Sequence, residues 1–213
     1  MHGMAQIRRK IFLSLRLATS LLLLSGISPA PEVPAKKNST LSFALPSPDS
    51  QLRLVIWKSH YTLTLYKGNT PVKTYRAVFG QGYRDGDKQM TGDKRTPEGE
   101  FYICSMNHSK RFYKFLGLSY PGIKHAEYGL RSNIITLNQY AMIKKAIDER
   151  QQPPWDTELG GAVGIHGRML DDTVSSQALS LQNWTDGCIA LNNSDVDEIY
   201  SVVTLGTPVK ILP

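Results

Sequence analysis

Two cysteines in 213 residues are too few for a disulfide-stapled scaffold or for a four-cysteine zinc site. Long apolar runs are also lacking. The longest, residues 17–27, covers eleven mostly apolar residues, whereas a membrane-spanning helix needs about 20. Charged residues make up 20% of the chain and hydrophobic residues 41%, which excludes both a disordered chain and a membrane bundle. The length fits one globular domain, or two small ones, with a real core.

Acidic residues are absent from positions 1–30, which hold four basic residues. The basic start, the apolar run and the small residues at 28–30 form the pattern of a secretory signal peptide. A retained signal anchor and a buried helix are the alternatives. We therefore expect residues 1–30 to direct export, residues 31–50, rich in Pro and Ser, to form a linker, and residues 51–213 to fold. Membrane contact is expected only through the N-terminal segment, if it stays uncleaved.

The net charge of +7 is unevenly distributed. Without residues 1–30 it falls to +3, and this remainder divides into +8 over residues 53–131 and −5 over residues 132–213. No basic helix, zinc knuckle or alternation of aromatic and basic residues accompanies the charge, so we expect no nucleic-acid partner. A domain with two charged halves fits a small charged substrate better.

Residue patterns predict a mostly β domain with two or three helices. Apolar alternation and β-branched or aromatic residues predict strands near 52–56, 61–66, 72–79, 99–106, 116–119, 162–166 and 209–212. Apolar spacing predicts helices over 139–152, before a Pro-Pro pair, and over 194–203, which begins with a serine cap and an acidic first turn. Residues 80–96, rich in Gly, Asp and Lys, are expected to form a loop.

Cys188 and His166 are the residues best suited to chemistry. Gly187 allows a tight turn that points successive backbone N–H groups at one spot beside Cys188, where they could hold an oxyanion. His166 lies 22 residues before Cys188, at the end of an apolar strand, and could deprotonate the thiol. A buried structural cysteine and a core histidine are the alternatives. Neither the glycines near residue 80 nor the other histidines have the spacing of a nucleotide loop or metal site, so no cofactor or metal is expected.

Two segments carry a family resemblance: Gly-Ile-His-Gly at 164–167 and Thr-Asp-Gly-Cys-Ile at 185–189. Together they resemble the signature of the L,D-transpeptidase (YkuD) family, a His-Gly pair followed after a gap by Ser/Thr-x-Gly-Cys-Ile/Val. Further blocks at 65–66, 74–77, 94–99 and 206–209 fall in the family's order. The resemblance covers residues 52–213. It implies a mainly β, β-sandwich-like L,D-transpeptidase catalytic domain with two or three short helices.

The resemblance also implies roles for individual residues. Cys188 would be the nucleophile and His166 its base. The backbone around Asp186, Gly187 and Cys188 would form the oxyanion hole, and the carbonyl of Gly167 would orient the histidine. Cys104, in a predicted strand, is most simply a small buried hydrophobe, although a disulfide with Cys188 would silence the site.

The sequence departs from the family pattern at two positions. Asp186 and Ala190 stand where members often have His and Arg. The first change leaves the nucleophile and base intact, whereas the missing arginine affects substrate anchoring. Other arginines could pair with substrate carboxylates, with a solvated surface role as the alternative. The candidates for anchoring are Arg111, Arg131 and Arg168; Trp184 and Tyr113 could line the cleft or pack in the core.

By resemblance, the expected activity is acyl transfer on peptidoglycan stem peptides through a thioester, in the periplasm or cell envelope of a bacterium. The acceptor could be an amine of another stem, the lysine of a wall-linked lipoprotein, a free D-amino acid or water. An L,D-carboxypeptidase or amidase that hydrolyses the same bonds is the close alternative. A non-catalytic wall-binding domain is another, suggested by Asp186 and Ala190.

Overall fold

The computed structural model describes residues 51–168 and 182–213, and each structural statement below concerns those two ranges. The predicted signal segment and linker, residues 1–50, lie outside the described residues.

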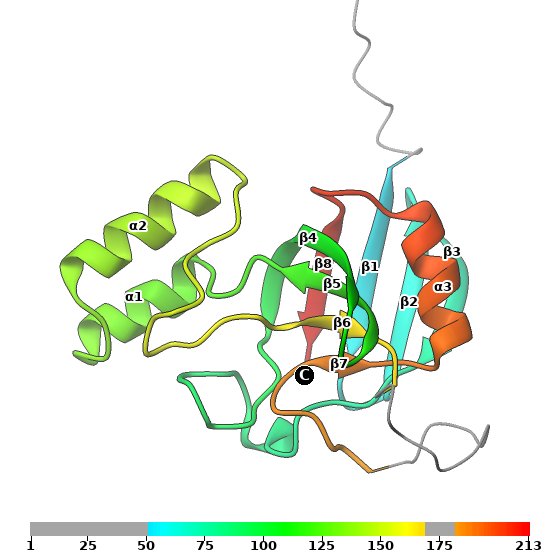
Figure 1. Ribbon diagram of the computed structural model, residues 1–213, viewed down its shortest axis with the longest axis horizontal. Coiled ribbons are helices and arrows are strands. Elements are labelled where there is room, and N and C mark those ends of the chain that lie inside the picture. Colours follow the sequence, from blue (N-terminus) through cyan, green and yellow to red (C-terminus); the bar gives the residue numbers. More distant parts are fainter. Residues whose placement is uncertain (1–50, 169–181) are drawn as a thin grey trace, which may run out of the picture. The chain divides into compact units, whose positions relative to one another are not determined.

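Within these ranges, eight strands form one curled sheet (Figure 1). In chain order they are β1 (Leu52–Trp57), β2 (Thr62–Lys67), β3 (Thr70–Arg76), β4 (Gly99–Ser109), β5 (Tyr113–Leu118), β6 (Gly164–His166), β7 (Ile189–Ala190) and β8 (Pro208–Leu212). Their spatial order is β3-β2-β1-β8-β4-β5-β6-β7. The closing strand β8 therefore lies inside the sheet, parallel to β1 and antiparallel to β4.

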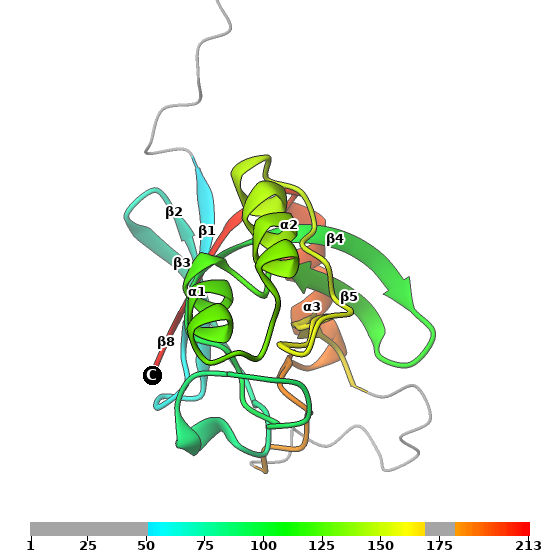
Figure 2. The ribbon, with the colours of Figure 1, turned by 90° about the vertical axis from the view of Figure 1, so that its left-hand side faces the viewer.

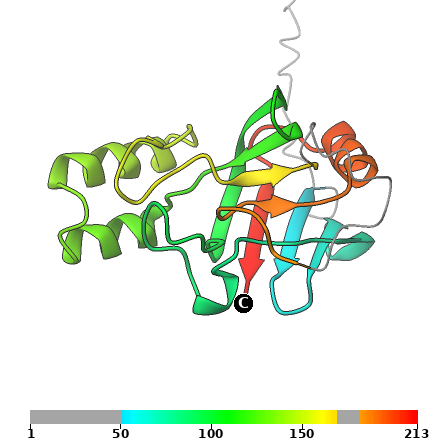
Figure 3. The same ribbon diagram turned by 60° about the horizontal axis from the view of Figure 1, so that its bottom comes forward.

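The long strand β4 joins the two parts of the sheet. Residues 99–102 pair with β8, and from Ile103 onward β4 pairs with β5. The register shifts at Cys104, which is the extra residue of a β-bulge, and a bulge increases the local bend and twist. In Figure 3 the yellow β6 and orange β7 accordingly run across the direction of the red β8. The predicted fold class, mainly β and β-sandwich-like with a few short helices, is confirmed.

The curled sheet encloses the main core. The apolar residues that alternate along the strands are buried there, as the sequence pattern predicts. Helix α3 (Asn193–Val202) adds Val196 and Ile199 from one of its faces. Members with less than 2% of their surface exposed include Leu54, Ile56, Leu63, Phe79, Ile103, Leu116, Leu118, Ile165 and Ile189.

The other two helices, α1 (Ile123–Arg131) and α2 (Leu137–Asp148), form a hairpin between β5 and β6 (Figure 2). They bury a second, smaller cluster, consisting of Ala126, Ile135, Ile143 and Leu159. Helix α2 begins earlier than the prediction because Thr136 and Gln139 form a capping box there, and it ends at Asp148, four residues before the predicted end at 152. Helix α1 was not predicted. Its first residue, Ile123, follows a glycine cap rather than a Ser, Thr or Asp signal.

The predicted loop after β3 is held by buried charges. Lys58, 2% exposed, donates to the carbonyls of Tyr83, Gly86 and Thr96 and pairs with Glu98 at 2.5 Å. Asp87 accepts from the Glu98 amide at 2.7 Å and contacts Lys124 and His125 of α1. Residues 77–79, predicted as the end of the third strand, instead join the core and make a single bridge from Val78 to Ala190.

No helix within the described ranges is both long and apolar enough to cross a membrane. In the same part of the chain, no group of three or more His, Cys, Asp or Glu side chains could hold a metal ion.

Candidate active site

Strands β6 and β7 bring the two candidate catalytic residues together. They pair in parallel, with Ile165 opposite Ile189 and His166 opposite Ala190. Cys188 immediately precedes β7, two residues before Ala190. If the alternation of side chains between the two faces of a sheet continues back from β7, Cys188 is expected on the same face as Ala190 and therefore as His166. The pairing thus brings together two segments that lie 22 positions apart in the sequence.

The His166 ring is held in one tautomer. It is 1% exposed, and its Nδ1 lies 2.7 Å from the carbonyl oxygen of Gly167. A carbonyl can only accept, so Nδ1 carries the proton and Nε2 keeps its lone pair. Burial lowers the pKa of His166 to about 4; the Gly167 carbonyl opposes this change and the charge of Arg111 adds to it. At neutral pH the ring is thus an uncharged proton acceptor, in the orientation that the family resemblance implies for Gly167.

Two aromatic side chains pack against this imidazole. Phe112 stacks on it, with ring centroids 4.3 Å apart and planes at 25°, and Trp184 meets it edge-on at 5.7 Å. The structure thus places the predicted Trp184 at the site. Phe112 was missed in the sequence, where it lies in a polar stretch at the turn between two strands and shows no periodic signal. Its role depends on the pairing of β5 with β6, which no local pattern reveals.

The backbone beside Cys188 makes a tight turn. Thr185 Oγ1 donates to the Cys188 carbonyl at 2.7 Å and accepts from the Gly187 amide at 3.2 Å. Gly187 has φ of +133°, and a Cβ there would lie 2.7 Å from the Arg95 carbonyl oxygen, so another residue does not fit. The Gly187 amide is occupied by Thr185. Gly187 thus serves to turn the chain, and the oxyanion hole at Asp186, Gly187 and Cys188 stays a prediction.

Opposing influences act on the Cys188 thiol. Burial raises its pKa to about 11, and the exposed Asp186 carboxylate contributes in the same direction. The Gly164 amide and the charge of Lys88 act the other way, because both favour the thiolate. At rest, Sγ lies 3.6 Å from the Ala162 carbonyl oxygen. The resting site therefore holds a neutral thiol and a neutral imidazole, and proton transfer must accompany the arrival of a substrate.

The predicted arginines separate into two groups. Arg111 lies over the Phe112 ring, 4.8 Å from its centroid, and Arg168 follows Gly167, with its amide donating to Asn193 Oδ1 at 2.8 Å. Both are beside the His166 region. Arg131 is exposed in the last turn of α1 and belongs to the helical hairpin. The substrate-binding role of Arg131 stays a prediction. Tyr113 is bound to Asp197 of α3 at 2.9 Å.

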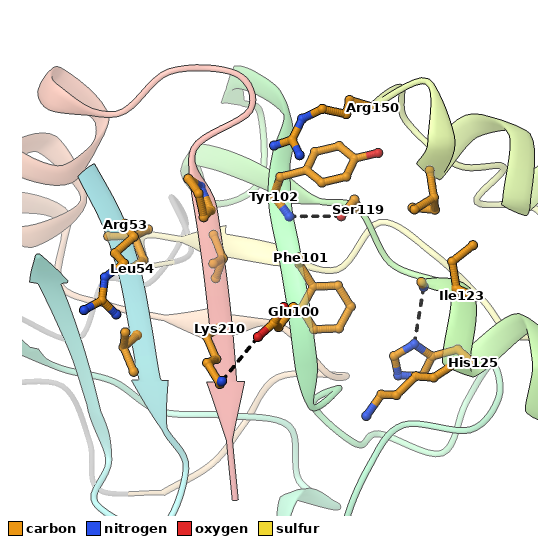
Figure 4. Close-up of a pocket in the computed structure, with 16 residues that line it drawn as sticks. Arg53, Leu54, Glu100, Phe101, Tyr102, Ser119, Ile123, His125, Arg150 and Lys210 are labelled. Atoms are coloured by element: carbon orange, nitrogen blue, oxygen red, sulfur yellow. Dashed lines mark hydrogen bonds and ion pairs between the residues drawn. The ribbon is translucent and has the colours of Figure 1, made fainter. Parts of the chain in front are cut away.

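A cavity of about 670 Å³ lies elsewhere, between the β1, β8 and β4 region and the start of α1 (Figure 4). Its lining includes four basic side chains, Arg53, Lys124, Arg150 and Lys210, with Glu100 paired to Lys210 at 3.2 Å. His166 and Cys188 are not part of its lining. This cavity is thus separate from the candidate active site.

Comparisons with known proteins agree with this arrangement of elements. The family model of the L,D-transpeptidase catalytic domain (YkuD) matches residues 51–211. A solved variant of the helical cell shape determining protein Pgp2 from Campylobacter jejuni has a TM-score of 0.51 and 19% identity, covering 76% of this chain and 47% of that chain. Bd1075 from Bdellovibrio bacteriovorus has a TM-score of 0.49 and 17% identity, and the match covers 76% of this chain and 48% of that chain. An L,D-transpeptidase from Xylanimonas cellulosilytica has a TM-score of 0.44 and 14% identity, and the match covers 78% of this chain and 62% of that chain.

The chain thus spans about half to three fifths of the length of these solved proteins. No curated protein matches it. At these identities the structural likeness speaks for the fold, whereas the family model covers most of the chain. By that match, the chain belongs to the L,D-transpeptidase catalytic domain (YkuD) family.

Proposed function

We propose that this protein is a cysteine-dependent L,D-transpeptidase that acts on peptidoglycan stem peptides through a thioester acyl-enzyme. One observation supports the proposal above all: the β6–β7 pairing sets His166 opposite Ala190, two residues after Cys188, and the Gly167 carbonyl orients the imidazole so that Nε2 can accept a proton. A nucleophile, its base and a group that orients the base are the parts that covalent acyl transfer requires.

In the proposed first half-reaction, Cys188 Sγ attacks the carbonyl of the third stem residue, a diamino acid such as meso-diaminopimelate. His166 Nε2 takes the thiol proton as the sulfur–carbon bond forms. The negative charge passes to the former carbonyl oxygen, where the Asp186 and Cys188 amides can receive it. When the intermediate collapses, His166 returns the proton to the departing amine of the terminal D-residue, and the thioester remains.

In the second half-reaction, an acceptor amine attacks the thioester while His166 removes its proton. The amide forms, and the proton returns to the Cys188 sulfur, so the enzyme is regenerated. A stem amine gives a 3→3 cross-link, a lipoprotein lysine attaches that protein to the wall, and a free D-amino acid exchanges the terminus. Water instead gives an L,D-carboxypeptidase or amidase, which remains the second candidate because the same two residues serve it.

Substrate anchoring is assigned to the two arginines beside His166. The stem peptides carry carboxylates, and a guanidinium can bind a carboxylate through two parallel hydrogen bonds. Arg111 is supported by Phe112, and the Arg168 backbone is fixed by Asn193. These residues stand in for the arginine that other family members have where this chain has Ala190. We further propose that the protein works in the cell envelope, as its basic and apolar N-terminal segment suggests.

The test is incubation of the purified protein with tetrapeptide-rich sacculi, followed by mass spectrometry of the released muropeptides. New 3→3 dimers would support transfer, and tripeptides without dimers would support hydrolysis. Cys188→Ala should abolish either product while it leaves the fold and the binding to sacculi intact. Binding without any product in the wild type would overturn the catalytic proposal in favour of a wall-binding domain.

A further inference from the structure

A second buried lysine lies in the loop that follows β3. Lys88 is 5% exposed, and its ammonium donates to Asp93 Oδ1 at 2.7 Å and to the Met90 carbonyl at 3.0 Å. The Asp93 side chain is itself only 11% exposed and also accepts from the amides of neighbouring loop residues. Taking an ammonium out of water is costly, so a buried lysine calls for a reason beyond surface solubility.

The Lys88 ammonium lies against the turn that carries the nucleophile. A Cβ built on Gly187 would be 3.8 Å from Lys88 Nζ, so the charge faces the side of Gly187 that a side chain would occupy. The turn cannot easily move away from it. A Cβ on Gly80 would lie 2.9 Å from the Gly187 Cα, which shows how closely the two backbones are packed. Cys188 is the next residue in the chain.

We propose that Lys88 is a positioning residue whose fixed positive charge, held behind the Gly187–Cys188 peptide, stabilises the negative charge that forms on the Cys188 sulfur and then on the oxyanion. This inference rests on the function proposed above. The site contains no charge on the sulfur at rest and gains one when the proton moves to His166. A cation already fixed against the Gly187 turn needs no reorganisation at that moment.

The opposing charges around the thiol agree with this role. Lys88 lowers the pKa of Cys188 against the larger effect of burial, while the carboxylate of Asp186 raises it. Asp186 stands where family members often have His. Lys88 and Asp186 thus act in opposite directions on the same sulfur, which provides a matched pair of variants.

The competing explanation is that Lys88 merely holds the loop. Lys58 provides the comparison, because it is equally buried, binds three carbonyls of the same loop and pairs with Glu98. It is not among the groups that influence Cys188. If loop rigidity alone mattered, replacing Lys58 would disturb Cys188 at least as much as replacing Lys88.

The experiment measures alkylation of Cys188 by iodoacetamide between pH 7 and 9, resolved by peptide mass spectrometry, with Cys104 of the same chain as the internal reference. In this range the rate follows the thiolate fraction. Lys88→Met should slow Cys188 relative to Cys104 about tenfold, equivalent to a pKa shift of about one unit. Asp186→Asn should raise the alkylation rate of Cys188 relative to Cys104 about threefold, because it removes a negative charge that disfavours the thiolate. Lys58→Met should leave the ratio unchanged, although it lowers the melting temperature.

Lys88→Met leaves the Asp93 carboxylate unpaired and could prevent folding, so the double variant Lys88→Met/Asp93→Asn is tested beside it. A slowed Cys188 in either folded variant, with partial rescue by Lys88→Arg, supports the proposal. An unchanged ratio in a folded Lys88→Met or double variant overturns it, and so does an equal loss in Lys58→Met. Alkylation requires no peptidoglycan turnover. A shifted ratio without muropeptide products would therefore refute the proposed function and leave the inference on Lys88 standing.

Discussion

The two cysteines lie in regions that look alike at rest and differ once a proton leaves. Cys104 is at the bulge of β4 and Cys188 is at the start of β7, and both are free and partly buried. Burial raises the pKa of each thiol to about 11. By resting acidity alone, neither would be called a nucleophile.

The difference lies in what surrounds each sulfur. Cys188 precedes the strand that pairs with the strand of the neutral His166, and the Gly164 amide and Lys88 both favour the Cys188 thiolate. Among the residues that the structure describes, burial raises the pKa of the Cys104 thiol and the backbone amide of Cys104 itself opposes it. If Cys188 is the nucleophile, as we propose, its reactivity is expected to come from groups that accept the proton and stabilise the anion during the reaction, and not from the resting pKa.

The largest effect is expected when an acylating probe is offered to both thiols. A carbapenem should add once per chain, on Cys188, because the proposed base, His166, lies on the strand that pairs with β7, directly after Cys188. Intact-mass spectrometry should show the adduct in the wild type and in Cys104→Ala, and none in Cys188→Ala. An adduct on Cys104, or its persistence in Cys188→Ala, would reverse the assignment of the nucleophile.

Removing the proposed base, His166, should reduce acylation of Cys188 almost as much as removing the cysteine itself. His166→Ala is expected to slow single-turnover acylation of Cys188 about 10³-fold, within the range typical of general-base catalysis. His166→Gln serves as a control of similar volume that keeps the packing against Phe112. A rate within tenfold of the wild type in either variant would show that the imidazole is not the base.

Burial of the same imidazole predicts a pH-dependent stability. The pKa of His166 is about 4 in the folded protein against an ordinary value of 6.5. Between these values the unfolded chain binds the proton first, so the free energy of unfolding falls as the pH drops from 6.5 towards 4. The contribution of this group is at most about 3 kcal/mol, roughly three hundredfold in the folding equilibrium.

Urea unfolding at pH 7.5 and at pH 4.5 measures this contribution. His166→Gln carries no titrating ring and should lose less stability over the same interval. The difference between the two proteins isolates His166 from the carboxylates that titrate nearby. Equal losses in both would contradict the buried, uncharged ring.

The candidate pair can be located from the sequence because the evidence for it is local. Two short motifs place Cys188 and His166, and strand alternation places the apolar core. The rest depends on contacts between distant segments. Phe112 reaches His166 only through the β5–β6 pairing, and Lys88 reaches Gly187 only because a long loop folds back. Neither contact leaves a local pattern.

Helix α1 was missed for the same reason, the lack of a local sequence signal. Helix α1 follows the cap residue Gly122, whose amide donates to Nδ1 of the His125 side chain. A histidine at this position of a helix is not a recognised start signal. Arg131, in the last turn of α1, stays a candidate anchor, because the chemistry of an arginine alone does not determine whether it binds substrate.

A smaller effect is expected from the ring that stacks on the base. Phe112→Ala should expose His166 to water and raise its pKa from about 4 towards the ordinary 6.5. The freed imidazole should also lose orientation, and acylation should slow about tenfold. NMR titration of the His166 Cε1 proton measures the first change. Trp184→Ala, which removes the edge-on neighbour instead, is the matched variant and should shift the pKa less; a larger shift there would assign the main support to Trp184.

The smallest effect is expected at the other cysteine. Cys104→Ala removes one sulfur from a bulge where the residue is only partly buried, so the free energy of unfolding should change by less than about 1 kcal/mol. Acylation of Cys188 should stay within about twofold of the wild type, because Cys104 is not among the groups that influence that thiol. Urea unfolding and single-turnover acylation measure the two quantities. A large loss of acylation with unchanged stability would mean that Cys104 takes part in the reaction. It would contradict the proposed difference between the two cysteines, in which Cys188 alone reacts.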